Sequence, residues 1–263
     1  MGLLTDIAIK LTKSAAESAI KTSRDKNIKG KLGESFTAAA LAWSKLFGRD
    51  GIVLRNVYIP KEDSDTAEID LLFITRKGIF VIESKNYSGI ITGTDLEKQW
   101  TAVMFSKNDM RKFLFYNPVM QNVNHVKSLR RILDEPNVPM FSFIVFSDRC
   151  SISGVTTSAD NTYVCNLSQL NKLIDTIWNQ NLDALTELQV SSIAAQLEPL
   201  TKVSTEVKEK HIASVSDKYG TNKEICPKCG GILVRRIAKT GRSAGREFLG
   251  CSNYPNCRFT RNI

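Results

Sequence analysis

Residues 67–87 read AEIDLLFITRKGIFVIESKNY, and their pattern is the most informative one for the fold. It contains two apolar runs rich in β-branched residues, 67–74 and 79–87, joined by a short polar turn that ends in Gly78. Runs of this composition on either side of a glycine-containing turn are typical of paired β-strands. The stretch therefore predicts a β-hairpin.

The predicted hairpin carries three charged residues whose spacing matters. Side chains alternate between the two faces of a strand. A four-residue loop would pair Ile74 with Ile79, and Asp70 would then lie opposite Glu83. A two-residue loop would instead place Asp70 opposite Lys85, with Glu83 on the diagonal. Both registers put the three charged side chains on one face, and a slip of one residue would turn the apolar pattern of one strand outward.

Two carboxylates that face each other across a sheet repel, so a fold that keeps them needs a cation between them. One or two carboxylates completed by waters suit Mg²⁺. An ammonium group on the same face can hold a water or a phosphate oxygen, which outlines a phosphodiester-cleaving site. The alternative is that Glu83 and Lys85 are charges that protect an edge strand from aggregation. Asp70 favours the site, because a charge inside an apolar run is costly unless it is paired or metal-bound.

The composition is that of a globular protein. The chain has 263 residues, 42% of them hydrophobic, which is enough for one large or two smaller domains. No apolar run approaches the length of a membrane span, and Lys10, Lys13 and Glu17 interrupt the region where a signal peptide would be apolar. Four of the six cysteines have metal-binding spacing, and Cys150 and Cys165 lie in apolar contexts. This usage predicts a reducing, cytoplasmic location.

Positive charge is concentrated near the C-terminus. Residues 223–263 hold nine of the 36 Lys and Arg and two of the 27 Asp and Glu, which gives this segment a net charge of +7 out of +9. A field of this sign suggests a polyanionic partner.

The pattern of the chain predicts four segments. Residues 1–27 are a helical segment with a basic face, residues 28–200 form an α/β core of mixed strands and helices, residues 201–222 are a linker that could be partly helical, and residues 223–263 are a small separate module. The core is predicted to include a buried strand at 140–146 and helices at 168–179 and 183–198.

Two predicted helices carry polar residues of interest. Asn117 and Pro118 start a helix, Asn as the cap and Pro in the first turn. On it, Gln121 and His125 lie one turn apart on a face other than the apolar one, and a lone histidine there is most simply structural. Glu34 lies near the start of an earlier helix, off its apolar stripe. It could complement the helix dipole or supply a third carboxylate, and the sequence does not choose.

The C-terminal module carries the most specific signal. Cys226, Cys229, Cys251 and Cys257 supply four thiolates, enough for a closed tetrahedral zinc site. About forty residues cannot bury a sufficient core, so the metal has to hold this fold together. Cations and aromatic side chains alternate around the cysteines. Cations can follow a phosphate backbone while aromatic rings stack on unpaired bases. The alternative is a protein-binding ribbon with the aromatics as its core. The predicted DNA-binding residues are Arg235, Arg236, Lys239, Arg242, Arg246, Phe248, Tyr254, Arg258 and Phe259.

Several of these motifs resemble those of the nuclease-related domain (NERD) family. They are Gly33-Glu34, Glu68-Ile69-Asp70, residues 78–89 and residues 117–122, and the resemblance covers about residues 28–140. That family is placed in the PD-(D/E)xK restriction-endonuclease-like fold. The resemblance implies that Asp70 and Glu83 bind Mg²⁺ or Mn²⁺, that Lys85 serves the attacking water, and that Glu34 and Gln121 assist. Ile69 stands where the literal motif has Pro, a departure that is usual in this fold.

Residues 224–261 resemble the C-terminal zinc finger of bacterial type IA topoisomerases, in which such fingers bind DNA, single strands especially. Together the two resemblances imply a divalent-metal-dependent DNA endonuclease with Mg²⁺ and Zn²⁺ as cofactors and no contact with membranes. The alternatives are a DNA-binding adaptor with an inactive nuclease-like core and, less expected, an RNA nuclease.

Overall fold

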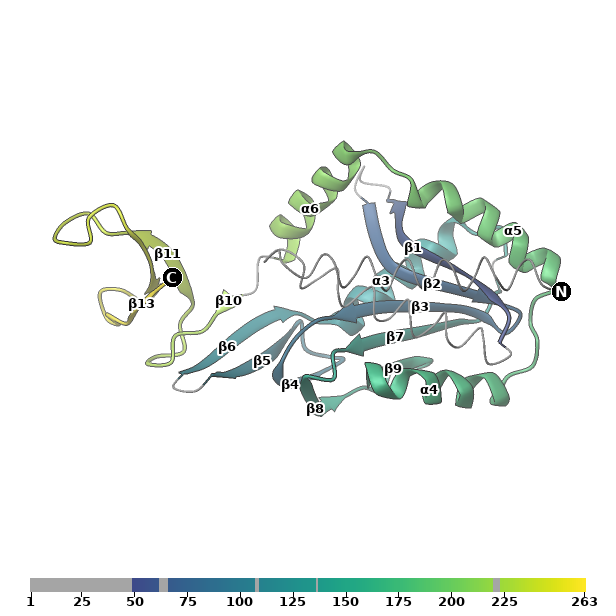
Figure 1. Cartoon of the computed structure of the whole chain (residues 1–263), viewed down its shortest axis with the longest axis horizontal. Coiled ribbons are helices and arrows are strands. Elements are labelled where there is room, and N and C mark those ends of the chain that lie inside the picture. Colours follow the sequence, from purple (N-terminus) through teal and green to yellow (C-terminus); the bar gives the residue numbers. More distant parts are fainter. Residues whose placement is uncertain (1–48, 62–65, 107–108, 136, 220–222) are drawn as a thin grey trace, which may run out of the picture.

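The computed structural model describes residues 49–61, 66–106, 109–135, 137–219 and 223–263 (Figure 1). The predicted N-terminal helical segment and Glu34 lie outside these residues.

The first of two five-stranded sheets contains the predicted hairpin. Its strand order is β1-β2-β3-β7-β9; the β1–β2 and β2–β3 pairs are antiparallel, and the β3–β7 and β7–β9 pairs are parallel. The strands are β1 (Gly51–Pro60), β2 (Thr66–Thr75), β3 (Gly78–Lys85), β7 (Met140–Phe146) and β9 (Thr162–Asn166). Every residue of β7 is buried, as its continuous apolar sequence predicts.

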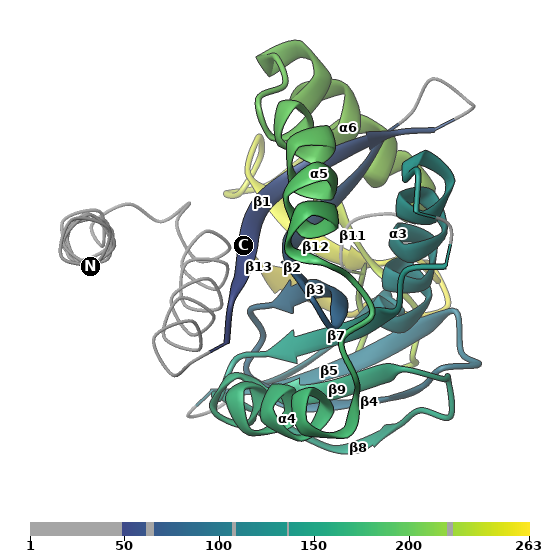
Figure 2. The ribbon, with the colours of Figure 1, turned by 90° about the vertical axis from the view of Figure 1, so that its right-hand side faces the viewer.

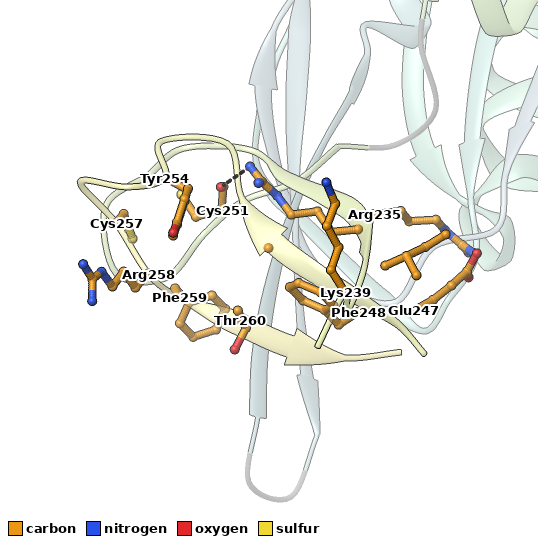
Figure 3. Close-up of a pocket in the computed structure, with 13 residues that line it drawn as sticks. Arg235, Lys239, Glu247, Phe248, Cys251, Tyr254, Cys257, Arg258, Phe259 and Thr260 are labelled. Carbon is orange, nitrogen blue, oxygen red and sulfur yellow. Dashed lines mark hydrogen bonds and ion pairs between the residues drawn. The ribbon is translucent and has the colours of Figure 1, made fainter. Parts of the chain in front are cut away.

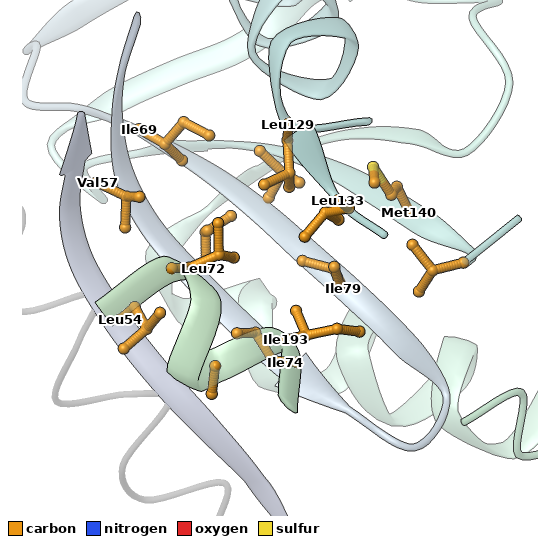
Figure 4. Close-up of a cluster of buried hydrophobic side chains, with 14 of the residues drawn as sticks. Leu54, Val57, Ile69, Leu72, Ile74, Ile79, Leu129, Leu133, Met140 and Ile193 are labelled. Atoms are coloured by element: carbon orange, nitrogen blue, oxygen red, sulfur yellow. The ribbon is translucent and has the colours of Figure 1, made fainter. Parts of the chain in front are cut away.

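Helices cover both faces of this sheet (Figure 2). On one face, α3 (Pro118–Ile132) and α5 (Glu187–Leu197) pack on β1, β2 and β3, and 3₁₀-helix η1 (Glu198–Thr201) follows α5. Figure 4 shows this cluster, in which Leu129 of α3 and Ile193 of α5 lie together with Leu72 and Ile74 of β2. On the opposite face, α4 (Leu167–Gln180) packs on a second cluster through Leu170, Ile174 and Ile177.

The two predicted helices after β9 both occur, with one shifted boundary. Helix α5 begins four residues later than expected, at Glu187. The Thr186 hydroxyl caps it by accepting a bond from the Gln189 amide. The residues before the cap are held elsewhere, because the amides of Ala184 and Leu185 donate to the carbonyl of Arg76.

The second sheet has the order β10-β6-β5-β4-β8. Its strands are β4 (Gly89–Thr94), β5 (Gln99–Ser106), β6 (Asp109–Tyr116), β8 (Cys150–Thr156) and β10 (Lys223–Glu224). One face packs Trp100 and Phe115 against Phe146 at the end of β7. Strand β8 was not predicted, because its sequence is mostly polar. It pairs in parallel with β4.

Two elements follow the core. Helix α6 (Thr205–Tyr219) occupies most of the predicted linker. A three-stranded antiparallel sheet then forms from β11 (Leu233–Ile237), β12 (Glu247–Cys251) and β13 (Thr260–Asn262). The predicted class, a mixed α/β fold with a small cysteine-bearing ribbon, is confirmed. No helix in the described ranges combines the length and hydropathy that a bilayer crossing requires.

Candidate active site and metal centre

The hairpin adopts the first of the two predicted registers. Ile74 pairs with Ile79, and the ladder runs to Leu71 opposite Ile82. One step further along this register brings Asp70 beside Glu83, on the face covered by α3. The Asp70 carboxylate accepts a bond of 2.7 Å from the Ser84 amide, which fixes it against β3. Asp70 is half-buried, whereas Glu83 is 2% exposed.

Glu83, Lys85 and Gln121 form a closed triangle of hydrogen bonds. The Lys85 ammonium donates to Glu83 Oε1 at 2.6 Å and to Gln121 Oε1 at 3.0 Å, and Gln121 Nε2 donates to the same Glu83 oxygen at 2.8 Å. Burial acts to lower the pKa of Lys85, but the carboxylates of Glu83 and Asp70 outweigh it, so the pKa is raised. The ammonium therefore stays charged at neutral pH.

His125 also reaches this site, and its predicted placement away from the buried face is wrong. It is 6% exposed, with Nδ1 3.6 Å from Glu83 Oε2. Burial lowers the pKa of His125 to about 4, so the ring is neutral at pH 7. Neither His125 Nδ1 nor Glu83 Oε2 has a hydrogen-bond partner among the described residues.

Two asparagines explain why α3 turns this side toward the sheet. Asn117 caps the helix by accepting from the amides of Val119 and Met120. Buried Asn122 donates to the carbonyl of Val81 and to the hydroxyl of Ser142, on the neighbouring strands β3 and β7. A helix fixed to the sheet through Asn122 presents the flanking positions, 121 and 125, to Glu83. The apolar stripe alone does not reveal this rotation.

The site face continues past Asp70 to a second polar cluster. Glu68 lies two residues earlier on β2, hence on the same face, and accepts a bond of 2.6 Å from the Tyr58 hydroxyl. His211 of α6 is 8% exposed; its Nε2 is 3.5 Å from Glu68, and its Nδ1 is 3.0 Å from the Thr66 hydroxyl. Sequence reasoning missed this anchor, because a histidine in a polar stretch gives no local sign of what it contacts.

The residues at the hairpin fit a hard divalent cation. Asp70 and Glu83 bring two carboxylates to one face, and the unpartnered buried oxygen of Glu83 is an orphan that an ion could satisfy. Two carboxylates with waters match the ligand preference of Mg²⁺. The third predicted carboxylate, Glu34, lies outside the described residues.

The four predicted zinc ligands come together in the C-terminal module. The sulfur atoms of Cys226, Cys229, Cys251 and Cys257 all lie within 4.8 Å of one another. The separation is 3.8 Å between Cys226 and Cys257 and 3.3 Å between Cys229 and Cys251. A zinc tetrahedron with bonds of about 2.3 Å has edges of about 3.8 Å, so the cluster fits this metal. Cys150 and Cys165, which lie in apolar stretches of the sequence, are buried, and burial raises their pKa to about 11 and about 12.

A groove of about 860 Å³ lies on one face of the zinc module (Figure 3). Arg236 crosses it with its guanidinium 5.6 Å from the Tyr254 ring centroid, and its Nη2 donates to the carbonyl of Cys251. A Cβ atom at Gly250 would lie 2.9 Å from Arg236 Cδ and 3.2 Å from Phe248 Cε2, so a larger residue there would displace Arg236. Of the nine predicted DNA-binding residues, two, Arg242 and Arg246, are exposed but do not line the groove. The seven that line it are Arg235, Arg236, Lys239, Phe248, Tyr254, Arg258 and Phe259.

The zinc module is joined to the core by strand pairing and by Arg261. Strand β10 pairs with β6, and the Ile225 amide donates to the carbonyl of Lys112. Arg261 of β13 makes ion pairs with Asp109 of β6 and with buried Glu224 of β10. Figure 1 shows the module at the end of the β5–β6 hairpin.

Comparisons with known proteins agree with these two parts. Residues 29–147 match the family model of the nuclease-related domain, and residues 223–263 match that of the topoisomerase DNA-binding C4 zinc finger. An uncharacterised protein of Bacillus anthracis is 30% identical over 191 residues, which are 73% of this chain and 85% of the relative.

Other relatives match over short stretches. DNA topoisomerase 1 of Archaeoglobus fulgidus is 60% identical over 35 residues, 13% of this chain and only 5% of that protein. YrdD of Escherichia coli is 50% identical over 42 residues, 16% of this chain and 21% of that protein. No solved structure gives a significant match. The chain therefore belongs to the nuclease-related domain family and carries a topoisomerase-type DNA-binding C4 zinc finger.

Proposed function

We propose that this chain is a DNA endonuclease that depends on Mg²⁺ or Mn²⁺ and that uses its zinc finger to bind DNA. The observation that carries the proposal is the arrangement at Glu83. A buried carboxylate faces Asp70 on one side, pairs with Lys85 on the other, and keeps one oxygen without a hydrogen-bond partner among the described residues.

Asp70 and Glu83 would hold the divalent ion, which supplies Lewis-acid stabilisation of the phosphate charge and activation of a water. Glu34, by its family resemblance, would be a third acid near them. The other roles in the proposed reaction belong to Lys85 and Gln121.

Lys85 places a positive charge on the face where the phosphodiester would bind. Its raised pKa keeps the ammonium charged, so it can hold a phosphate oxygen or the attacking water but does not act as a base in the metal-free chain. Gln121 donates to Glu83 and accepts from Lys85, so it fixes their relative position. It is a positioning residue.

The zinc finger would supply affinity for DNA. Its groove combines cations with aromatic rings, a combination that tracks a phosphate backbone and stacks on unpaired bases. We therefore propose single-stranded DNA as the preferred ligand of the finger. We also propose that the protein is cytoplasmic, because its cysteine usage suits a reducing compartment.

The first prediction concerns cleavage of single-stranded and supercoiled duplex DNA. The zinc-loaded protein is incubated with Mg²⁺, with Mn²⁺ or with neither; EDTA is avoided because it would also strip the finger. We expect metal-dependent cutting, abolished in Asp70→Ala, Glu83→Gln and Lys85→Ala. Glu187→Gln is the control, since this carboxylate is 88% exposed at the start of α5. If Glu83→Gln cleaved DNA like wild type, Glu83 would not belong to the active site and the proposed site would be wrong.

The second candidate function is a DNA-binding adaptor with an inactive core. One observation favours it: Lys85 and Gln121 already satisfy Glu83 Oε1 without an ion. Thermal unfolding separates the two functions. A melting temperature that rises with Mg²⁺ or Mn²⁺ in wild type but not in Asp70→Ala supports the nuclease. DNA binding without cutting or metal stabilisation supports the adaptor.

A further inference from the structure

The second sheet has one face in the core and one face in solvent. Ile91, Trp100 and Phe115 are buried on the inner face. Because side chains alternate along each strand, the residues between them point the other way. We call this side the outer face, and its residues used below are Ile90, Val103, Phe105, Met110, Lys112 and Lys223.

Large apolar side chains on the outer face are exposed in the part of the chain that the structure describes. Phe105 is 62% exposed, Met110 is 54% exposed and Ile90 is 41% exposed. They belong together: Phe105 pairs with Met110 between β5 and β6, and Val103 pairs with Ile90 of β4. A contiguous exposed apolar stripe over three strands is typical of a binding surface.

The charges on the outer face have one sign. Lys112 pairs with Val103 at the centre of the stripe, Lys223 of β10 pairs with Leu114 next to it, and both lysines are exposed. None of the described outward-pointing residues of β4, β5, β6 and β10 is acidic. Asp109 and Glu224 point to the inner side, where Arg261 pairs with both. A flat ring among cations fits a polyanion that carries planar groups.

We propose that the outer face binds single-stranded nucleic acid, with a base stacked on Phe105 and phosphates near Lys112 and Lys223. Exposed aromatic residues on a sheet bind unpaired bases in this way, and nearby cations follow the backbone. This inference deepens the proposed function, since it rests on the chain being a DNA-binding protein.

The position of the outer face supports one continuous path for the strand. Lys223 lies three residues before the zinc-ligating position Cys226. The finger is bonded to the β5–β6 hairpin through the ion pair between Arg261 and Asp109. At the other side of the sheet, β4 begins four residues after Lys85. The outer face therefore lies between the finger, at the β10 edge of the sheet, and β4, the strand that follows the active-site hairpin in the chain.

The test measures binding of a labelled oligothymidylate of about 24 nucleotides, long enough for more than one subsite, by fluorescence anisotropy. The full zinc-loaded chain is used without Mg²⁺ or Mn²⁺, so that cleavage does not enter. The variants are Phe105→Leu, which keeps an apolar side chain but loses the ring, Phe105→Trp, which restores one, and Lys112→Glu. Leu188→Ala and Lys172→Glu are matched exposed controls on helices of the first sheet.

We expect Phe105→Leu to weaken binding by about five-fold or more and Phe105→Trp to bind like wild type. Lys112→Glu should weaken binding and lower the slope of log K against log salt by about 0.7 for each phosphate that is no longer neutralised. The controls should match wild type. Unchanged affinity and salt slope in both Phe105→Leu and Lys112→Glu would overturn the proposal.

Two further outcomes distinguish nucleic-acid binding by the outer face from self-association and from nuclease activity. If wild type sediments as a dimer, and Phe105→Leu is monomeric with unchanged DNA affinity, the outer face is a self-association surface and the proposal is wrong. If no metal supports cleavage but Phe105→Leu loses affinity, the nuclease proposal fails and the outer face stands as a nucleic-acid site.

Discussion

At the scale of single residues, Glu83 is a buried carboxylate whose stability depends on its partners. Its carboxylate is 3% exposed, and Lys85 is its cationic partner at 2.6 Å. Removing one partner of a buried ion pair leaves an uncompensated charge, which costs more than the pair itself contributes. Loss of activity in a Lys85 variant therefore has to be separated from loss of stability.

A double-mutant cycle makes this separation. We expect Lys85→Ala to lower the free energy of unfolding by about 3 kcal/mol, because Glu83 stays buried and charged. The double variant Glu83→Gln/Lys85→Ala should lose less than Lys85→Ala alone, since the uncompensated charge is gone. Urea unfolding of wild type, Glu83→Gln, Lys85→Ala and the double variant, all without divalent ions, completes the cycle.

The control for this cycle is Lys202→Ala. Lys202 pairs with Glu198 at 2.7 Å, but both side chains are more than half exposed, so Lys202→Ala should unfold at the same urea concentration as wild type. If the double variant were as unstable as Lys85→Ala, the buried charge would not be the source of the loss.

At the scale of elements, α6 shows how a weakly patterned segment acquires a fixed place. Ile212 is 65% exposed, and the described anchor of α6 is His211, packed edge-on against Tyr58 and bonded at Thr66. A helix with few apolar contacts depends on such a polar anchor.

We expect His211→Ala to release α6 from β2. Hydrogen exchange of the α6 amides, followed by mass spectrometry, should accelerate by about ten-fold, equivalent to about 1.4 kcal/mol of local stability. Ile212→Ala is the control, one residue away and largely exposed, and it should leave exchange unchanged. Equal exchange in His211→Ala and wild type would mean that other contacts hold the helix.

At the scale of the whole molecule, the finger and the core are linked through the second sheet. Arg261 connects β13 of the finger, β10 of the connecting strand and β6 of the core. Its side chain is 15% exposed and Glu224 is 9% exposed, so this is a partly buried network rather than a surface pair.

We expect Arg261→Ala to detach the finger from the β5–β6 hairpin without unfolding the finger. Trypsin should release the finger faster than from wild type, while the zinc content stays the same because the four cysteines are untouched. Arg258→Ala, an exposed arginine in the same module, is the control. Loss of zinc in Arg261→Ala would show instead that this residue supports the ribbon itself.

Features that depend on local spacing could be predicted from the sequence alone. Alternation along residues 67–87 placed Asp70, Glu83 and Lys85 on one face whichever loop formed. The spacing of the four cysteines defined a metal cluster, because few other arrangements bring thiolates together in so short a chain. Asn117 and Pro118 indicated the start of α3, because a helix cap acts within one turn of the chain.

Features that depend on contacts between distant segments could be seen only in the folded structure. Asn122 sets the rotation of α3 by bonding to β3 and β7, and this rotation brings His125 to Glu83. Pairing of β10 with β6 docks the finger, and Phe105 and Met110 of the outer face are exposed. Periodicity identifies a buried face, but it carries no information about which distant polar group will meet it.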